Sequence, residues 1–178
     1  MINAKNKIPV KLLTCSAMLI ALEVVLNRFC SFNTMGLKIG FSFVPIAVAA
    51  YLFGPLCAAA VCGTADLIGA ILFPIGPYHP GFTLCAAAMG FVYGIFLHRK
   101  KDKSIRLFPN IIVPALVNNL FFGLFVNTFW VSMLYSSKAY WGWFVYRLPE
   151  YAVLIPLNIL IIPIIVKLCD QLKKSLHI

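Results

Sequence analysis

The fold is decided by residues 41–74, which read FSFVPIAVAAYLFGPLCAAAVCGTADLIGAILFP. The one charged side chain in this stretch is Asp66. Gly54 and Pro55 favour a tight turn and divide the stretch into two apolar segments, 42–54 and 55–74. A helix needs about 20 apolar residues to cross the hydrocarbon core of a bilayer. We therefore expect two consecutive membrane helices here, of which the first is short and is tilted or partly unwound.

The rest of the chain has the same character. It is 62% hydrophobic and 11% charged, against about 45–50% and about 25% in soluble domains. No connecting segment is large or polar enough to form a soluble domain, so residues 1–178 are expected to form one integral-membrane domain. We predict an all-α membrane protein, a compact bundle of six transmembrane helices at roughly 8–29, 42–54, 55–74, 81–98, 107–135 and 146–169.

The formal net charge of +10 invites a nucleic-acid partner, but the distribution of the charge favours a membrane surface. Most of the 15 basic residues lie before the first span, between spans four and five (99–106), or after span six. With six spans these segments share one side. The positive-inside rule then places both termini in the cytoplasm.

Ionisable residues within or next to the spans are the sharpest indication of a binding site, because charges are costly in hydrocarbon. Asp66 lies toward the outer part of span three. Its carboxylate suits the paired donors of a cyclic amidine-type edge, such as an aminopterin ring; the alternative is a buried ion pair with Arg28 or Arg147. Those two arginines either snorkel to the headgroups or clamp a carboxylate. Glu23, mid-span without an evident partner, is interpreted as structural.

Aromatic and amide side chains near the same outer face complete the candidate site. Asn127 and Trp130 in span five combine hydrogen-bonding groups with an aromatic face, although the asparagine also suits interhelical packing. The second outer loop is rich in Pro and Gly, and its Tyr78 and Phe82 are candidates for one wall of a lid. His79 is either part of that lid or an exposed loop residue.

Catalytic and metal-binding motifs are absent from the sequence. It contains no HExxH, GxSxG or phosphate-binding glycine pattern, and its six cysteines lack metal-site spacing. We therefore expect no enzyme activity, no metal and no cofactor. Without a nucleotide-binding segment, the chain cannot power transport alone. Ala17 and Ala21, four residues apart, permit close helix approach, either inside the bundle or against another membrane protein.

Several segments together resemble a known family. Residues 40–56 (GFSFVPIAVAAYLFGPL), 65–74 (ADLIGAILFP) and 80–84 (PGFTL) resemble the substrate-binding S components of energy-coupling factor (ECF) vitamin transporters, especially the folate-specific branch. Residues 127–135 (NTFWVSMLY) and 146–148 (YRL) fit that branch as well. The Ala17–Ala21 pair matches the AxxxA docking motif of the family.

The resemblance implies a six-helix protein of a bacterial cell membrane that binds one vitamin, here folate, at the extracellular side. It implies docking through Ala17 and Ala21 on a transmembrane T subunit with two ATP-binding subunits, and toppling within the membrane to release the vitamin. The alternatives are an S component for a riboflavin- or thiamin-class vitamin, a small membrane enzyme, or a scaffold subunit. The predicted substrate-binding residues are Arg28, Asp66, Tyr78, His79, Phe82, Asn127, Trp130 and Arg147.

Overall fold

A computed structural model describes residues 10–34, 37–98, 108–135 and 139–175, most of which are helical. Within these ranges, five helical segments are long and apolar enough to cross a membrane, in agreement with five of the predicted spans. They are α1 (Val10–Arg28), α3 (Pro55–Leu72), α4 (Pro80–Leu97), the composite segment Asn110–Leu134 and α7 (Tyr140–Ser175), of which Tyr140–Gln171 is the crossing part.

The predicted short span forms α2 (Phe43–Phe53), a helix of 11 residues. At 1.5 Å per residue it is about 16 Å long, roughly half the thickness of the hydrocarbon core. The described residues therefore contain five long apolar helical segments and a helix of about half that length. The turn after α2 is made by Gly54, whose φ of 87° is unfavourable for residues with a Cβ, and Pro55 then begins α3.

Small residues bring α2, α3 and α4 close together at the centre of the bundle. Ala47, Ala50 and Ala58 are fully buried in one apolar cluster. In α4, a Cβ added at Gly94 would lie 2.2 Å from Cα of Pro55, so the two backbones nearly touch. This is the close approach that small residues at helix interfaces permit in membranes.

The fifth predicted span is helical throughout its described length, but it is not a regular α-helix. It runs through η2 (Phe108–Ile112), α5 (Val113–Leu116), η3 (Val117–Val126) and α6 (Asn127–Leu134), and both η segments have wide, π-type turns. Such turns are rare and occur frequently at functional sites. Asn127 begins α6, directly after the wide turns.

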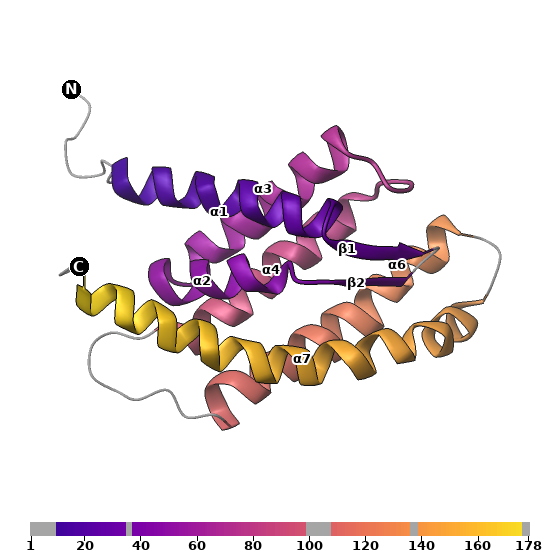
Figure 1. Ribbon diagram of the computed structural model, residues 1–178. Coiled ribbons are helices and arrows are strands. Elements are labelled where there is room, and N and C mark those ends of the chain that lie inside the picture. Colours follow the sequence, from indigo (N-terminus) through magenta and orange to yellow (C-terminus); the bar gives the residue numbers. More distant parts are fainter. Residues whose placement is uncertain (1–9, 35–36, 99–107, 136–138, 176–178) are drawn as a thin grey trace.

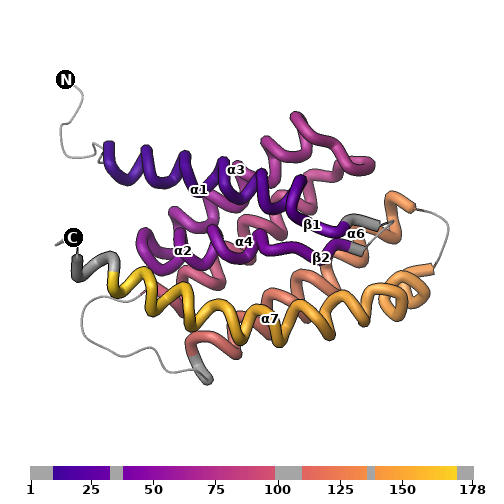
Figure 2. The backbone as a smooth tube through the Cα atoms, in the orientation of Figure 1, coloured from indigo at the N-terminus to yellow at the C-terminus, as the bar shows by residue number. Residues whose placement is uncertain are grey.

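The segment between the first two helices forms a β-hairpin, which the sequence analysis did not predict. Strands β1 (Ser31–Thr34) and β2 (Leu37–Gly40) are antiparallel, with Ser31 opposite Gly40. The hairpin extends toward the end of the bundle where α6 ends and α7 begins (Figures 1 and 2). The third outer loop is shorter than expected, because α7 already begins at Tyr140.

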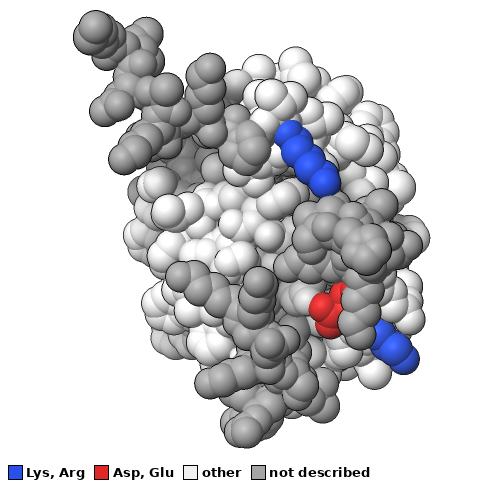
Figure 3. All heavy atoms as spheres, turned by 90° about the vertical axis from the view of Figure 1, so that its left-hand side faces the viewer, with Lys and Arg blue, Asp and Glu red and all other residues white. Residues whose placement is uncertain are grey.

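The other end of the bundle carries both ends of the chain, since α1 begins there and α7 ends there (Figure 1). Figure 3 views this end; its described part shows basic side chains and an acidic one on an otherwise uncharged surface. Lys11 and Lys167 are exposed. The basic segment 99–106, on which the predicted orientation depended, lies outside the described residues.

Candidate binding site

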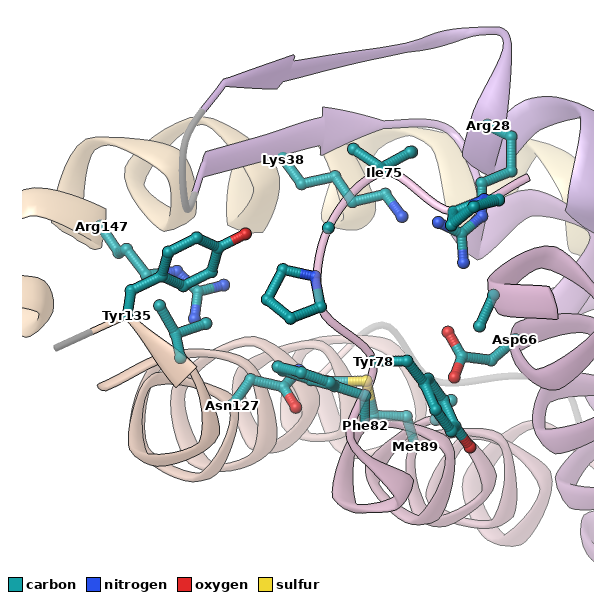
Figure 4. A pocket seen from close by; sticks show the side chains of 16 residues that line it. Arg28, Lys38, Asp66, Ile75, Tyr78, Phe82, Met89, Asn127, Tyr135 and Arg147 are labelled. Carbon is teal, nitrogen blue, oxygen red and sulfur yellow. The ribbon is translucent and has the colours of Figure 1, made fainter. Parts of the chain in front are cut away.

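A cavity of about 600 Å³ lies below the hairpin, among the outer ends of the helices (Figure 4). Its volume is typical of small-molecule sites, which span about 300–1,000 Å³. Six of the eight predicted site residues line it: Arg28, Asp66, Tyr78, Phe82, Asn127 and Arg147. The lining that the prediction did not include is Lys38, Ala70, Pro74, Ile75, Gly76, Pro77, Ala86, Met89, Val131 and Tyr135.

One side of the cavity is formed by Asp66 of α3 and Arg28 of α1 (Figure 4). The half-buried Asp66 carboxylate accepts a hydrogen bond from Oγ1 of Thr83 at 2.8 Å. Oγ1 of Thr83 also lies 2.8 Å from the hydroxyl of Tyr78, so the chain Tyr78–Thr83–Asp66 ties the second outer loop to α3 and α4. Among the described residues, Asp66 forms no ion pair with either arginine. The ion pair that was considered as the alternative role of Asp66 is therefore not formed in this structure.

The opposite side of the cavity holds Arg147, Asn127 and Tyr135 (Figure 4). Arg147 is 6% exposed and is held by its own neighbours in α6 and α7. Its guanidinium donates from Nε to Oε2 of Glu150 at 3.2 Å and from Nη2 to the hydroxyl of Tyr151 at 2.7 Å. A third bond runs from Nη1 to Oγ1 of Thr128 at 3.2 Å. Arg147 therefore does not snorkel to the surface: its charge is balanced by Glu150 inside the protein.

Lys38 of β2 lines the cavity and was not predicted to do so. Its half-buried side chain reaches over the cavity from the hairpin, and its ammonium points toward the side that holds Arg28 and Asp66 (Figure 4). Burial and, to a lesser extent, the nearby Arg28 lower the pKa of Lys38 to about 8, against the opposing effect of Asp66 and other carboxylates. The sequence signal was a single lysine in an otherwise uncharged hairpin segment, which alone is equally typical of a solvated loop.

His79 and Trp130 lie beside the cavity, outside its lining. Their rings stack on each other, with centroids 4.5 Å apart and planes at 23°. Nδ1 of His79 accepts the backbone N–H of Gly81 at 3.0 Å, which caps α4. Gly81 in turn packs on the Trp130 ring, because a Cβ there would lie 2.4 Å from Cε2. Trp130 was expected to stack on a ligand ring; in this structure it stacks on His79.

A smaller chamber of about 220 Å³ shares Lys38, Asp66, Asn127 and Arg147 with the main cavity and continues it among the helices. Its lining includes Glu23, which is 3% exposed. The interpretation of Glu23 as lacking a local partner was wrong: Nδ2 of Asn27, one helical turn away, donates to its Oε1 at 2.9 Å.

Ala17 and Ala21 of α1 are part of neither lining, and both are exposed. They belong to an apolar surface of α1 that also exposes Leu13, Met18 and Leu22. The pair therefore does not pack inside the bundle. For metal binding, no group of three or more His, Cys, Asp or Glu side chains suitable for an ion occurs in the part of the chain that the structure describes.

The apolar helices and the polar cavity together define a multi-pass membrane protein with a cavity of small-molecule size at one end of its bundle. Comparison with known proteins gives the family. Residues 11–166 match the family described as ECF transporter, substrate-specific component, and the chain belongs to that family. Its members are transporter components, which agrees with the expectation that this chain is not an enzyme.

Two curated relatives have the same description. A protein of Clostridium novyi (strain NT) named Folate transporter FolT is 39% identical over 158 residues, which cover 88% of each chain. A Folate transporter FolT of Leuconostoc mesenteroides is 30% identical over 125 residues, covering 70% of this chain and 65% of the relative.

Solved structures share the fold. A crystal structure of FolT bound with folic acid has a TM-score of 0.79 and 31% identity, covering 90% of this chain and 97% of that one. The S component for biotin from an ECF-type ABC transporter has a TM-score of 0.65 at 23% identity, covering 98% of this chain and 95% of that one. The second likeness supports the fold alone.

Proposed function

We propose that this protein is the folate-binding S component of a bacterial ECF transporter. The observation that carries the proposal is the cavity below the hairpin, in which the Asp66 carboxylate lies among the cationic side chains Arg28, Lys38 and Arg147. Folate presents both complementary features, a pterin edge rich in N–H donors and negatively charged carboxylates. The likeness to a folic-acid-bound FolT and to two curated folate transporters supports the same ligand.

In this proposal the chain is one domain with six membrane segments, α2 being the short one, and both termini are cytoplasmic. An even number of membrane segments returns the chain to the side on which it began. In support of this, both chain ends lie at one end of the bundle, opposite the hairpin (Figure 1). The positive-inside rule favours the cytoplasm for that end. The cavity then opens to the outside, where the vitamin is captured.

The site residues take complementary roles. Asp66 and Asn127 bind the pterin edge, and Tyr78 and Phe82 form the wall of the lid. Arg28 faces a carboxylate, while Arg147 lines the opposite wall. His79 and Trp130 support this arrangement through the start of α4, where they pack on each other and on Gly81. The excess of cationic over anionic side chains in the lining favours an anionic ligand over a cationic one such as thiamin.

Transport requires partners that supply energy: a transmembrane T subunit and two ATP-binding subunits. We propose that the exposed Ala17–Ala21 face of α1 docks on the T subunit, because small residues allow close helix contact in a membrane. Folate must bind the outward state more tightly than the docked state, since only a difference in affinity shifts an equilibrium between two states.

Calorimetry on the purified protein tests the proposal. Folic acid should bind stoichiometrically, whereas riboflavin and thiamin should give no comparable heat. An ultraviolet spectrum of the protein as purified should show whether a pteridine or a flavin copurifies. Tight binding of a flavin or of thiamin, with no response to folic acid, would exclude the folate assignment.

A further inference from the structure

Three cations line the cavity, but they are not equally available to a ligand. Arg147 is buried and makes three hydrogen bonds within the protein, one of them to the carboxylate of Glu150. In a buried ion pair the two charges compensate each other, and breaking the pair is strongly destabilising. Arg147 therefore offers a ligand little net charge, although its side chain borders the cavity.

Arg28 and Lys38 are in a different situation. Neither forms an ion pair with a carboxylate in the described parts of the chain. The buried Nε of Arg28 has no hydrogen-bond partner among the described residues, and its guanidinium is packed on Gly69 of α3. Lys38 points toward this same side of the cavity from the hairpin above (Figure 4). Asp66 of α3, which accepts a hydrogen bond from Thr83, is the one carboxylate among the described residues that line the main cavity. Two cations therefore accompany a single carboxylate on this side, which leaves an excess of positive charge.

The Arg147–Glu150 pair lies next to Lys38. All three residues line the smaller chamber, where β2 packs on α7. The bond from Nε of Arg147 fixes the Glu150 carboxylate on this side of α7. The ion pair thus lies against the strand that carries Lys38.

We propose that Lys38, together with Arg28, supplies the charge that holds a ligand carboxylate, and that the Arg147–Glu150 ion pair is a positioning device that fixes the hairpin carrying Lys38. This assignment rests on the proposed function, because it takes folate as the ligand. It makes Lys38 a specificity-determining residue for anionic ligands.

The pKa of Lys38 provides an independent readout. With a pKa of about 8 in the free protein, Lys38 is mostly protonated at pH 7 and loses its charge as the pH rises through 8. A bound carboxylate favours the protonated form and raises this pKa, so folate affinity should be constant well below pH 8 and should fall as the pH rises through 8. The charged and titratable groups around Lys38 are Glu23 and Arg28 of α1, Asp66 of α3, Tyr78 of the second outer loop, Tyr135 after α6, and Arg147 and Glu150 of α7.

The experiment compares three variants with three ligands by calorimetry: Lys38→Met, Lys38→Arg and Arg147→Met, each with folic acid, pteroic acid and 6-hydroxymethylpterin. The last ligand has no carboxylate and pteroic acid lacks the glutamate. Lys38→Met should weaken folic acid binding about 10-fold to 100-fold, the range for a charge-assisted bond, and should leave 6-hydroxymethylpterin unchanged. Lys38→Arg should restore folic acid binding, and its affinity should no longer fall between pH 8 and 9.

Arg147→Met should have the same ligand selectivity as Lys38→Met, because it acts through the position of Lys38. It should weaken folic acid and pteroic acid by a smaller factor than Lys38→Met, should leave 6-hydroxymethylpterin nearly unchanged, and should retain the decline of affinity at high pH. The assignment is overturned if Lys38→Met binds folic acid like the wild type, or if Arg147→Met weakens 6-hydroxymethylpterin as much as folic acid. Failure of the wild-type protein to bind any of the three ligands would instead overturn the proposed function itself.

Discussion

Replacing Asp66 by alanine tests the polar recognition that the cavity offers. Asp66 is half-buried in α3, and its Oδ2 is occupied by Thr83 at 2.8 Å. The other carboxylate oxygen is available to a donor pair on the pterin edge. Hydrogen bonds to a charged group contribute about 1.5–3 kcal/mol. At about 1.4 kcal/mol per factor of ten, the variant should bind folic acid roughly 10-fold to 150-fold more weakly.

Calorimetric titration of the purified variant with folic acid measures this change. The matched control is Thr83→Val, which removes the hydroxyl that bonds Asp66 and Tyr78 but retains the carboxylate. We expect the control to weaken binding by less than tenfold, since it alters only the orientation of Asp66. If Asp66→Ala and the wild type titrate alike, Asp66 does not contact the ligand and the predicted role of its carboxylate is refuted.

Two further predictions concern packing and docking. Gly94→Ala should lower the Tm of the protein by the equivalent of about 1–3 kcal/mol or more, because the new Cβ would lie 2.2 Å from the Pro55 backbone; Gly63→Ala, whose Cβ would meet a side-chain methyl at 3.3 Å, should have little effect in the same melting assay. Replacing Ala17 and Ala21 together by leucine should leave folic acid affinity unchanged and should abolish ATP-dependent uptake in vesicles that contain the complete transporter. Retained uptake would show that this face of α1 does not dock.

The sequence was sufficient to identify the membrane helices and the nature of the site. Backbone groups in lipid must be satisfied within a helix, so long apolar runs such as 55–74 can form little else. A charge such as Asp66 or Arg28 beside hydrocarbon is costly, so it marks a cavity or a partner without knowledge of the fold. The wide turns of η3 were not predicted, because nothing in the composition of the fifth span indicates them.

The tertiary structure decided which charges are available to a ligand. Lys38 lies in a segment whose composition suits an ordinary loop, and only the pairing of β1 with β2 brings its side chain over the cavity. Trp130 and His79 are far apart in the sequence, and their stacking depends on how α4 packs on α6. From the sequence, Arg147 could equally have extended to the membrane surface or bound a ligand. In the structure it is buried and forms an ion pair with Glu150. The hydropathy of a segment is a property of its local sequence. The pairing of charges depends instead on distances between helices and strands, and those distances are set only in the folded bundle.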